Sequence, residues 1–203
     1  MGLYDRYLLP HLIDFACGMG EVMKARSQIV PQAHGRVLEI GIGSGLNLSF
    51  YDPASVSVIV GVDPSAEMQK LAQQRAAATA IPVEMVALEL GQIQTEAASF
   101  DSIVCTFTLC TIPDAVAALK EMRRVLKPGG RLLFCEHGLA PDAPVVRWQH
   151  RLTPLWKPLA GGCHLNRDIP ALLQAGGFRI GALENRYLKG PRPMTYIYQG
   201  WAE

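Results

Sequence analysis

Charged residues are scarce in this chain of 203 residues: they make up 18% of the sequence and leave a net charge of +1. Nucleic-acid-binding domains usually carry a marked basic excess, so we expect no nucleic-acid partner. The five cysteines include no CxxC pair and no zinc-like spacing. This pattern argues against a metal site and favours a reducing compartment.

Long apolar runs are also missing. The N-terminal segment has no signal-peptide pattern, and polar residues from Asp5 to Asp14 interrupt it well short of the roughly 20 apolar residues that a membrane span needs. We therefore expect a cytoplasmic protein. The remaining apolar residues of this segment follow one line of a helix, at Leu8, Leu12, Phe15 or Ala16, Met19, and Val22 or Met23. Such a helix fits a lid or a cover over the core, and it leaves peripheral membrane contact open.

Short apolar segments rich in β-branched residues alternate with helical ones, and no linker or internal repeat divides the chain. Five of these segments are expected to be buried strands, at 36–40, 56–62, 83–86, 102–107 and 131–135. Strands separated by helical crossovers predict a parallel, doubly wound sheet. Two further strands, at 178–183 and 194–199, have a short connection that suits an antiparallel pair. The predicted fold class is therefore α/β, with a seven-stranded, mostly parallel sheet and one antiparallel strand near its edge.

Helix boundaries support this division. We expect one helix to begin after Ser65, and another, capped by Asp114, to bury Leu119, Met122 and Leu126 before the sequence KPGG ends it. The chain is then one domain with four parts. These are N-terminal lid helices (1–34), a ligand-binding core (35–136), a cap on the opposite side of the site (137–177) and a final antiparallel strand pair (178–203).

Glycines occupy three alternate positions, Gly41, Gly43 and Gly45, directly after the first expected strand. In a doubly wound sheet, ligands bind beyond the carboxyl ends of the strands, and glycines let the backbone approach them. We expect the loop to present its N–H groups at the start of a helix. A tight strand–helix turn without a ligand is the structural alternative.

Asp63 ends the second expected strand, about 20 residues after the glycines. A carboxylate in this position accepts hydrogen bonds from ribose hydroxyls, although Asp63 also fits a simple helix cap. Pyrophosphate cofactors favour the spacing G-x-G-x-x-G, whereas this loop reads G-x-G-x-G and follows the acidic Glu39. An acidic neighbour suits an ammonium group better than phosphates. This reasoning favours S-adenosylmethionine over NAD as the ligand.

Four motifs resemble class I S-adenosylmethionine-dependent methyltransferases, notably the ubiquinone/menaquinone-biosynthesis-like group. They are "VLEIGIGSG", "VGVDPS", "SFDSIVCTFTLCTIPD" and "RVLKPGGRLLF", which together span roughly residues 36–136. A narrower resemblance reaches the C-terminal third: "CTFTLCTIPD", "FCEHG" and "LTPLWKPLAGGCHLNRD" are similar to segments of the membrane-associated alkyl-thiol S-methyltransferases. Those enzymes have an apolar N-terminal anchor, and we do not expect one in this segment.

The resemblance implies a donor-binding set. Glu39 would hold the donor's ammonium group through water, the glycine loop would face its methionine moiety, Asp63 would bind ribose, and Pro64 would flank adenine. Further contacts implied for the adenine are Glu89 and Leu90, where the family usually has an Asp at the first position. Thr106 would lie near the sulfonium, and the N-terminal segment with Tyr7 and His11 would close over the donor and the acceptor.

Methyl transfer from a sulfonium is an in-line displacement, so the protein mainly positions the acceptor and excludes water. A thiol acceptor attacks as its thiolate, which a nearby imidazole assists. His137 is our first candidate for this role, with Glu136 orienting it or contacting the acceptor. A structural strand-end histidine is the alternative interpretation of His137.

The remaining acceptor-side candidates come from three segments. Cys110 and Thr111 follow the fourth expected strand, while His164 and Asn166 lie in the glycine-containing loop "GGCHLN". Trp148 belongs to an apolar helical stripe, completed by Val145, Leu152, Trp156 and Leu159 and interrupted at Pro154. This stripe fits packing against the core, an apolar roof over the acceptor, or a face that meets lipid.

Together with these residues, the resemblance implies a methyltransferase that acts on a small or apolar molecule, with a thiol or sulfide as the favoured acceptor and S-adenosylhomocysteine as the product. C- or O-methylation of a quinone precursor and N-methylation of phosphatidylethanolamine are the alternatives. A non-catalytic S-adenosylmethionine-binding protein is a further alternative. We expect a monomer or a homodimer.

Overall fold

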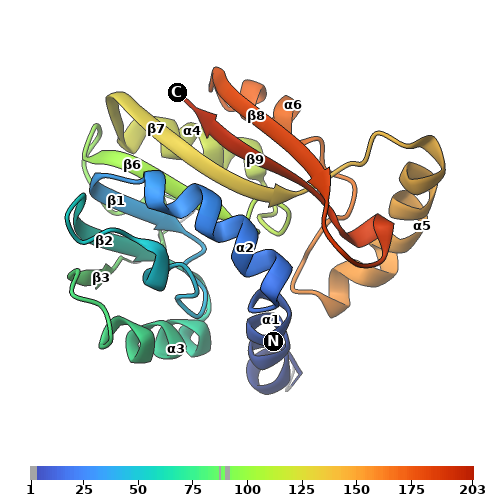
Figure 1. Cartoon of the computed structure of the whole chain (residues 1–203), viewed down its shortest axis with the longest axis horizontal. Helices are drawn as coiled ribbons and strands as arrows, with labels where there is room; N and C mark the ends of the chain where they lie inside the picture. Colours follow the sequence, from blue (N-terminus) through green and yellow to red (C-terminus); the bar gives the residue numbers. More distant parts are fainter. Residues whose placement is uncertain (1–3, 87, 90–91) are drawn as a thin grey trace.

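The fold is a twisted seven-stranded sheet with helices on both faces (Figure 1). We describe it from a computed structural model that covers residues 4–86, 88–89 and 92–203. The strands of this sheet lie in the order β3-β2-β1-β6-β7-β9-β8. Their bounds are β1 Gly35–Ile40, β2 Val56–Val62, β3 Val83–Met85, β6 Phe100–Thr106, β7 Leu126–His137, β8 Ile180–Tyr187 and β9 Tyr196–Ala202.

Strand directions confirm the predicted fold class. The strands β3, β2, β1, β6 and β7 pair in parallel, whereas β9 pairs antiparallel with both β7 and β8. The single reversed strand is therefore β9, one place in from the edge. A two-stranded ribbon of β4 (Leu88–Glu89) and β5 (Gln92–Ile93) follows β3 and was not predicted.

Six α-helices accompany the sheet in the described part of the chain. They are α1 Leu9–Cys17, α2 Gly20–Ile29, α3 Ala66–Ala76, α4 Ala115–Val125, α5 Ala143–Leu159 and α6 Ile169–Ala175. In Figure 1, α2 crosses one face of the sheet, while α4 and α6 lie behind the other and α5 stands beyond the end of β7. A π-helical turn, Tyr4–Leu8, precedes α1, and none of the described helices is long and apolar enough to cross a membrane.

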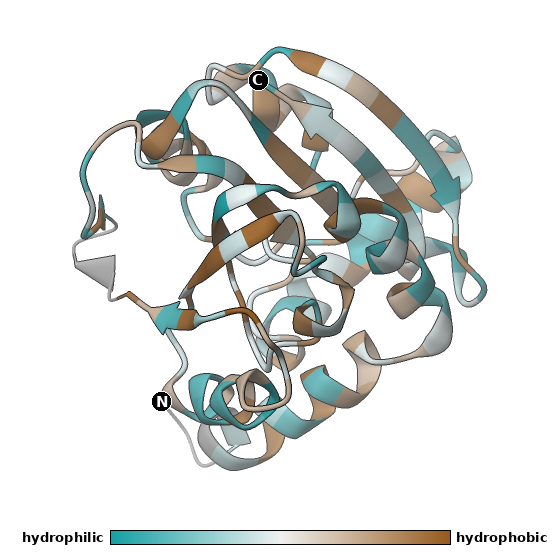
Figure 2. Cartoon of the chain, turned by 60° about the vertical axis from the view of Figure 1, so that its left-hand side comes forward, coloured by the Kyte–Doolittle hydropathy of each residue, from teal (hydrophilic) through white to brown (hydrophobic). Residues whose placement is uncertain are grey.

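Strand side chains alternate between two apolar clusters, one on each face of the sheet. Leu38 and Ile103 pack with α4 and α6, whereas Val37 and Val104 pack with α2. Figure 2 shows this apolar concentration in the inner strands. Both faces of the inner strands are therefore buried, which explains their nearly continuous apolar sequence.

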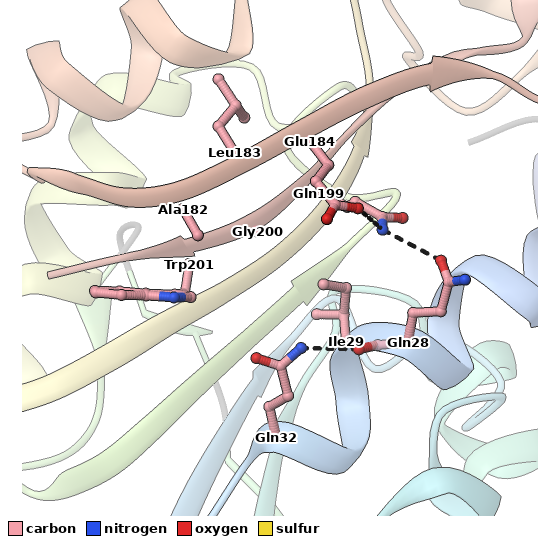
Figure 3. A pocket seen from close by; sticks show the side chains of 9 residues that line it. All are labelled: Gln28, Ile29, Gln32, Ala182, Leu183, Glu184, Gln199, Gly200 and Trp201. Carbon is pink, nitrogen blue, oxygen red and sulfur yellow. Dashed lines mark hydrogen bonds between the residues drawn. The ribbon is translucent and has the colours of Figure 1, made fainter.

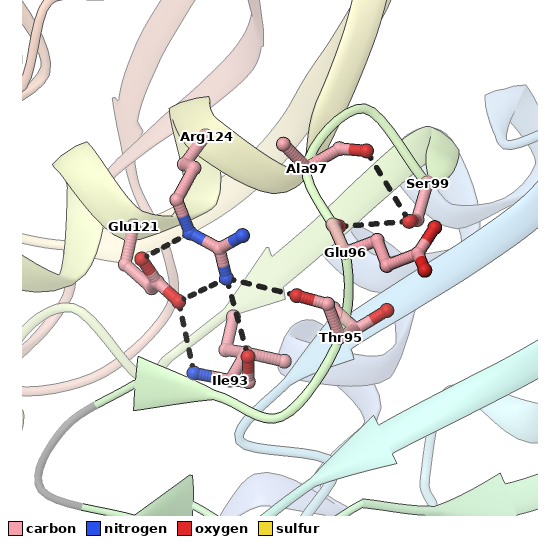
Figure 4. Close-up of polar contacts among 7 residues, drawn as sticks. All are labelled: Ile93, Thr95, Glu96, Ala97, Ser99, Glu121 and Arg124. Atoms are coloured by element: carbon pink, nitrogen blue, oxygen red, sulfur yellow. Dashed lines mark hydrogen bonds and ion pairs between the residues drawn. The ribbon is translucent and has the colours of Figure 1, made fainter.

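The ends of α4 agree with the sequence. The Asp114 carboxylate accepts a hydrogen bond from the N–H of Ala117 at 2.9 Å, and Leu119 and Met122 are buried as predicted. The helix ends at Val125, after which the predicted stop sequence is already extended as the start of β7. Arg124 and Glu121 on this helix form an ion pair that also binds the backbone around Ile93 (Figure 4).

Packing of the whole apolar stripe of α5 against the core, one of the three interpretations of this stripe, is wrong. The helix continues through Pro154, and its buried line runs through Val145, Gln149 and Thr153. Trp148 is 54% exposed and Leu159 is 60% exposed. Polar Gln149 occupies the inner line because its amide binds the N–H of Ala140 and the carbonyl oxygens of Gly138 and Pro193.

The apolar line of the N-terminal helix also faces outward. Leu8, Leu12, Phe15 and Met19 are all exposed, Phe15 by 76%. Helix α1 is instead tied to the body through Asp14, whose carboxylate accepts from Ser44 Oγ at 2.5 Å and pairs with Arg75 at 2.9 Å. This apolar line therefore does not cover the core.

Candidate active site

The carboxyl ends of the parallel strands meet at one edge of the sheet, as the strand register requires. Ile40 at the end of β1 is paired with Val62 of β2 and with Cys105 of β6, and Thr106 is paired with Cys135 of β7. The loops that leave these strands therefore converge. This edge brings together most of the candidates that the sequence identified.

Glycine is required in the loop after β1. Gly41, Gly43 and Gly45 have φ values of +66°, +56° and +81°, which side chains disfavour. A Cβ atom on Gly41 would also clash with Thr108 in the loop after β6. The expected α-helix does not follow this loop: only a 3₁₀ turn, Leu48–Phe50, is formed.

Asp63 fixes the glycine loop from the end of β2. Its Oδ2 accepts from the N–H of Gly43 at 2.9 Å, and its Oδ1 accepts from the N–H of Ser65 at 2.8 Å. Burial raises the pKa of this carboxyl, against the effect of the two N–H donors. Each carboxylate oxygen retains capacity for another donor. Ser65, not Asp63, is the N-cap of α3, and Pro64 lies exposed beside it.

Glu39 lies under the glycine loop in a buried polar network. It is 1% exposed, and its oxygens accept from Asn47 Nδ2 at 2.9 Å and from Tyr51 Oη at 2.7 Å. Arg26 on α2 joins this network by donating to Asn47 Oδ1 at 2.8 Å and to Thr106 Oγ1 at 2.5 Å. Burial raises the pKa of Glu39 to about 7.

Sequence reasoning missed Arg26. Nothing in the sequence distinguished this arginine from its charged neighbours Glu21 and Lys24, and its partners lie up to 80 residues away. In the structure its guanidinium is buried, and the Nε–H has no acceptor among the described residues. Arg26 also lies over the ring of Phe107, 5.1 Å from the centroid.

Glu136 holds the loop that follows β6. Both of its carboxylate oxygens accept from the N–H of Thr108 at 3.0 Å, and Cys105 Sγ donates to it at 3.4 Å. Phe107 in this loop has a φ of +53°, an uncommon conformation for a residue other than glycine. Burial raises the pKa of Glu136 to about 7. The contacts in the structure are those of a loop-positioning group, and a catalytic role for Glu136 stays a prediction.

His137 and the loop after α5 meet on the same edge. His137 is buried, and its Nε2 lies 3.4 Å from the carbonyl oxygen of Pro193. It also forms a hydrogen bond with Cys163. His164 binds the carbonyl oxygen of Cys110 through its N–H at 2.8 Å and its ring Nδ1 at 3.1 Å. Cys110, His137, Cys163 and His164 therefore form one cluster above β6 and β7.

Other candidates lie outside this cluster. Asn166 Nδ2 is 2.8 Å from Nδ1 of His150 on α5, and Trp148 faces solvent on the same helix. Thr111 Oγ1 donates to the carbonyl oxygen of Thr108 within the loop after β6. Tyr7 and His11 are exposed. Leu90 and the side chain of Glu89 lie outside the described residues.

A hollow of about 360 Å³ lies elsewhere, between α2 and the strands β8 and β9 (Figure 3). Its polar side chains bind one another: Gln199 Nε2 donates to Gln28 Oε1 at 3.2 Å and to Glu184 Oε2 at 3.1 Å. None of the predicted site residues lines it. The strand-end edge, not this hollow, is therefore the candidate active site.

Replacing Glu39 with glutamine should flatten the pH dependence of stability. The folded-state pKa of about 7 lies above the ordinary value of 4.5, so the contribution of Glu39 to stability is full below about pH 4.5 and is lost as the pH rises through about 7. We expect the free energy of unfolding to fall less between about pH 5 and pH 8 in Glu39→Gln than in the wild type, measured by urea denaturation.

The matched control is Glu67→Gln, which removes a surface carboxylate paired with Lys70 at 3.2 Å on α3. This variant should keep the wild-type slope. Equal slopes in Glu39→Gln and the wild type would mean that Glu39 does not titrate in this range.

Comparisons with known proteins agree with this geometry. Residues 38–134 match the family model described as a methyltransferase domain. Thiol S-methyltransferase TMT1B from Rattus norvegicus is 37% identical over 65% of this chain and 55% of its own length, and the Homo sapiens protein is 35% identical over 83% and 69%. Ubiquinone/menaquinone biosynthesis C-methyltransferase UbiE from Geotalea daltonii is 39% identical over 51% and 46%.

Among solved structures, the methyltransferase CalH in complex with SAH superposes with a TM-score of 0.64 at 27% identity, covering 96% of this chain and 58% of CalH. The chain thus spans from about half to about two thirds of the length of these relatives. The family resemblance seen in the motifs is confirmed. This chain belongs to the S-adenosylmethionine-dependent methyltransferases, and S-adenosylmethionine is its cofactor.

Proposed function

We propose that this enzyme methylates a small or apolar thiol or sulfide in the cytoplasm. The observation that carries the proposal is the similarity to TMT1B, named a thiol S-methyltransferase, which extends over 83% of the chain and so beyond the donor-binding motifs. The cluster around His137 supports it, because it places an imidazole beside the loops that leave β6 and α5. A thiolate formed there has a positive or proton-accepting neighbour.

The residues at the strand-end edge fit S-adenosylmethionine. The buried Nε–H of Arg26, which lacks an acceptor in the described part of the chain, matches the carboxylate of the methionine moiety. Gly41 leaves no room for a side chain beside Thr108, so glycine is required where the loops after β1 and β6 approach each other. Asp63 retains acceptor capacity for ribose hydroxyls.

When bound, this cofactor supplies a methyl group already activated by the sulfonium charge. The protein then needs to bind and orient the acceptor and to remove its proton. The carboxyl groups of Glu39 and Asp63 lie beside the glycine loop, where their oxygens suit the donor's cationic groups. Thr106, held by Arg26 and Asn47, fixes the end of β6 at the centre of this edge. His137 is the proposed group that accepts the thiol proton or stabilises the thiolate.

Asp63→Asn should weaken donor binding. The substitution removes the negative charge and one acceptor while keeping the size of the side chain. Hydrogen bonds to a charged group contribute about 1.5–3 kcal/mol, so we expect the Kd for S-adenosylhomocysteine to rise by roughly tenfold or more. Isothermal titration calorimetry measures this change directly.

Asp52→Asn is the matched control, because Asp52 also accepts from a backbone N–H two residues on, that of Ala54 at 2.9 Å, but lies on the surface. Its Kd should equal that of the wild type. Unchanged affinity in Asp63→Asn, with the fold intact by circular dichroism, would remove Asp63 from the ribose role.

His137→Gln should lower turnover of an alkyl thiol without a comparable loss of donor affinity. A thiol of pKa near 8.5 is mostly protonated at neutral pH, so losing a base costs about 10²–10⁴-fold there. The variant should recover toward the wild-type rate near pH 9, where the thiolate forms without help. Methyl transfer measured from about pH 6 to pH 9 tests this expectation.

His34→Gln serves as the control, since His34 lies at the opposite end of β1 beside Ser102. It should follow the wild-type profile. If His137→Gln and the wild type had parallel pH profiles, His137 would be a structural strand-end residue. If the wild type transferred no methyl group to thiols, the proposed acceptor class would be wrong.

A further inference from the structure

Two cysteines meet where the loops after β6 and α5 touch. Cys110 lies in the first loop and Cys163 in the second, and a hydrogen bond joins the two thiol groups. The backbone holds them in place: the N–H of His164 donates to the carbonyl oxygen of Cys110 at 2.8 Å, and the N–H of Cys163 donates to that of Ala160 at 3.1 Å. The two sulfur atoms are therefore neighbours because both loops are fixed.

The surroundings of Cys163 favour its thiolate. Its sulfur receives hydrogen bonds from the thiol of Cys110 and from His137, and the indole of Trp156 lies beside it. The Trp156 Nε1 is buried and has no other hydrogen-bond partner among the described residues. The hydrogen bond from Cys110, followed by that from His137, lowers the pKa of Cys163, while the same contact raises the pKa of Cys110.

Accessibility gives the two sulfurs different roles. Cys163 is partly exposed, whereas Cys110 is only 3% exposed. Of the two residues, Cys163 is therefore the one nearer to solvent. Cys105 and Cys135 are buried within strands, and burial raises the pKa of each. These two cysteines lack both the exposure and the donors that activate Cys163.

We propose that Cys163 and Cys110 form a thiol–disulfide exchange site for small organic disulfides, with Cys163 as the attacking sulfur and Cys110 as the resolving sulfur. The inference goes beyond the proposed methyl transfer, because it needs no methyl donor. The geometry that carries it is the pairing of two thiols held by fixed loops, with an imidazole and an indole N–H around the more exposed sulfur.

The reaction balances in two steps. The Cys163 thiolate attacks one sulfur of a disulfide RSSR, forming a mixed disulfide and releasing one RS⁻. Cys110 then loses its proton to solvent and attacks the Cys163 sulfur, which releases the second RS⁻ and leaves a Cys110–Cys163 disulfide. The external disulfide is reduced to two thiols, and the two cysteines are oxidised. A reducing dithiol restores them by the same exchange.

The product of this exchange is a thiolate, which belongs to the acceptor class proposed above. Each turn releases a thiolate beside the loop after β6, on the edge where the donor-binding residues lie. A disulfide could thus be converted into methyl acceptors at the place of transfer. This connection rests on the proposed function, whereas the exchange itself does not.

The test uses the full chain, reduced and then freed of reductant, with 2-hydroxyethyl disulfide as the probe and no methyl donor. We expect two equivalents of 2-mercaptoethanol per chain and an intact mass lower by two hydrogens. Cys110→Ser should release one equivalent and retain a hydroxyethylthio adduct on Cys163. Cys163→Ser should release almost none.

Cys17→Ser is the matched control: Cys17 is also partly exposed, but burial raises its pKa, so this variant should react like the wild type. Peptide mapping of the oxidised wild type should identify the Cys110–Cys163 link, which keeps the test decisive if a variant fails to fold. A link between other cysteines, or rapid exchange by Cys163→Ser, would overturn the proposal. Methyl-transfer assays on the same protein separate this outcome from failure of the proposed function.

Discussion

Two buried carboxylates hold the loops on which the site depends. Glu39 at the end of β1 and Glu136 at the end of β7 are 1% and 0% exposed, and burial raises the pKa of each to about 7. Burying a carboxylate is costly unless hydrogen bonds compensate. Here the donors come from the loop and side chains that must be positioned: Asn47 and Tyr51 for Glu39, and the N–H of Thr108 for Glu136. The hydrogen bonds that offset the cost of burial therefore also fix the geometry of this edge of the sheet.

This constraint explains how distant segments reach one site. Asn47 connects Glu39 to Arg26, so the network that holds the glycine loop also fixes α2 against the end of β6. The loop held by Glu136 in turn carries Cys110, against which the segment after α5 docks. Donor-side and acceptor-side groups thus share one set of buried hydrogen bonds. Loops held in this way suit an enzyme that works mainly by positioning its reactants.

The sequence was sufficient where local pattern determines structure. β-branched runs located the inner strands, Asp114 marked the start of α4, and the glycine loop with Asp63 predicted two segments that touch directly through Gly43. Contacts between distant segments could not be predicted from the sequence. Neither the partners of Arg26 nor the Cys110–Cys163 contact follows from spacing, because each joins segments distant in the chain. On α5, the apolar period left core packing, an apolar roof and a lipid-facing surface open, and the buried amide of Gln149 decides which side faces the body.

The most direct test of the account is release of S-adenosylhomocysteine by the purified protein against acceptors of different chemistry. The panel contains sulfide, alkyl and aryl thiols, a quinol precursor, and phosphatidylethanolamine in micelles. We predict turnover confined to the sulfur acceptors and increasing with pH as the thiolate forms. Turnover only with the quinol or the lipid would contradict the account, because the cluster around His137 would then have no thiol to activate.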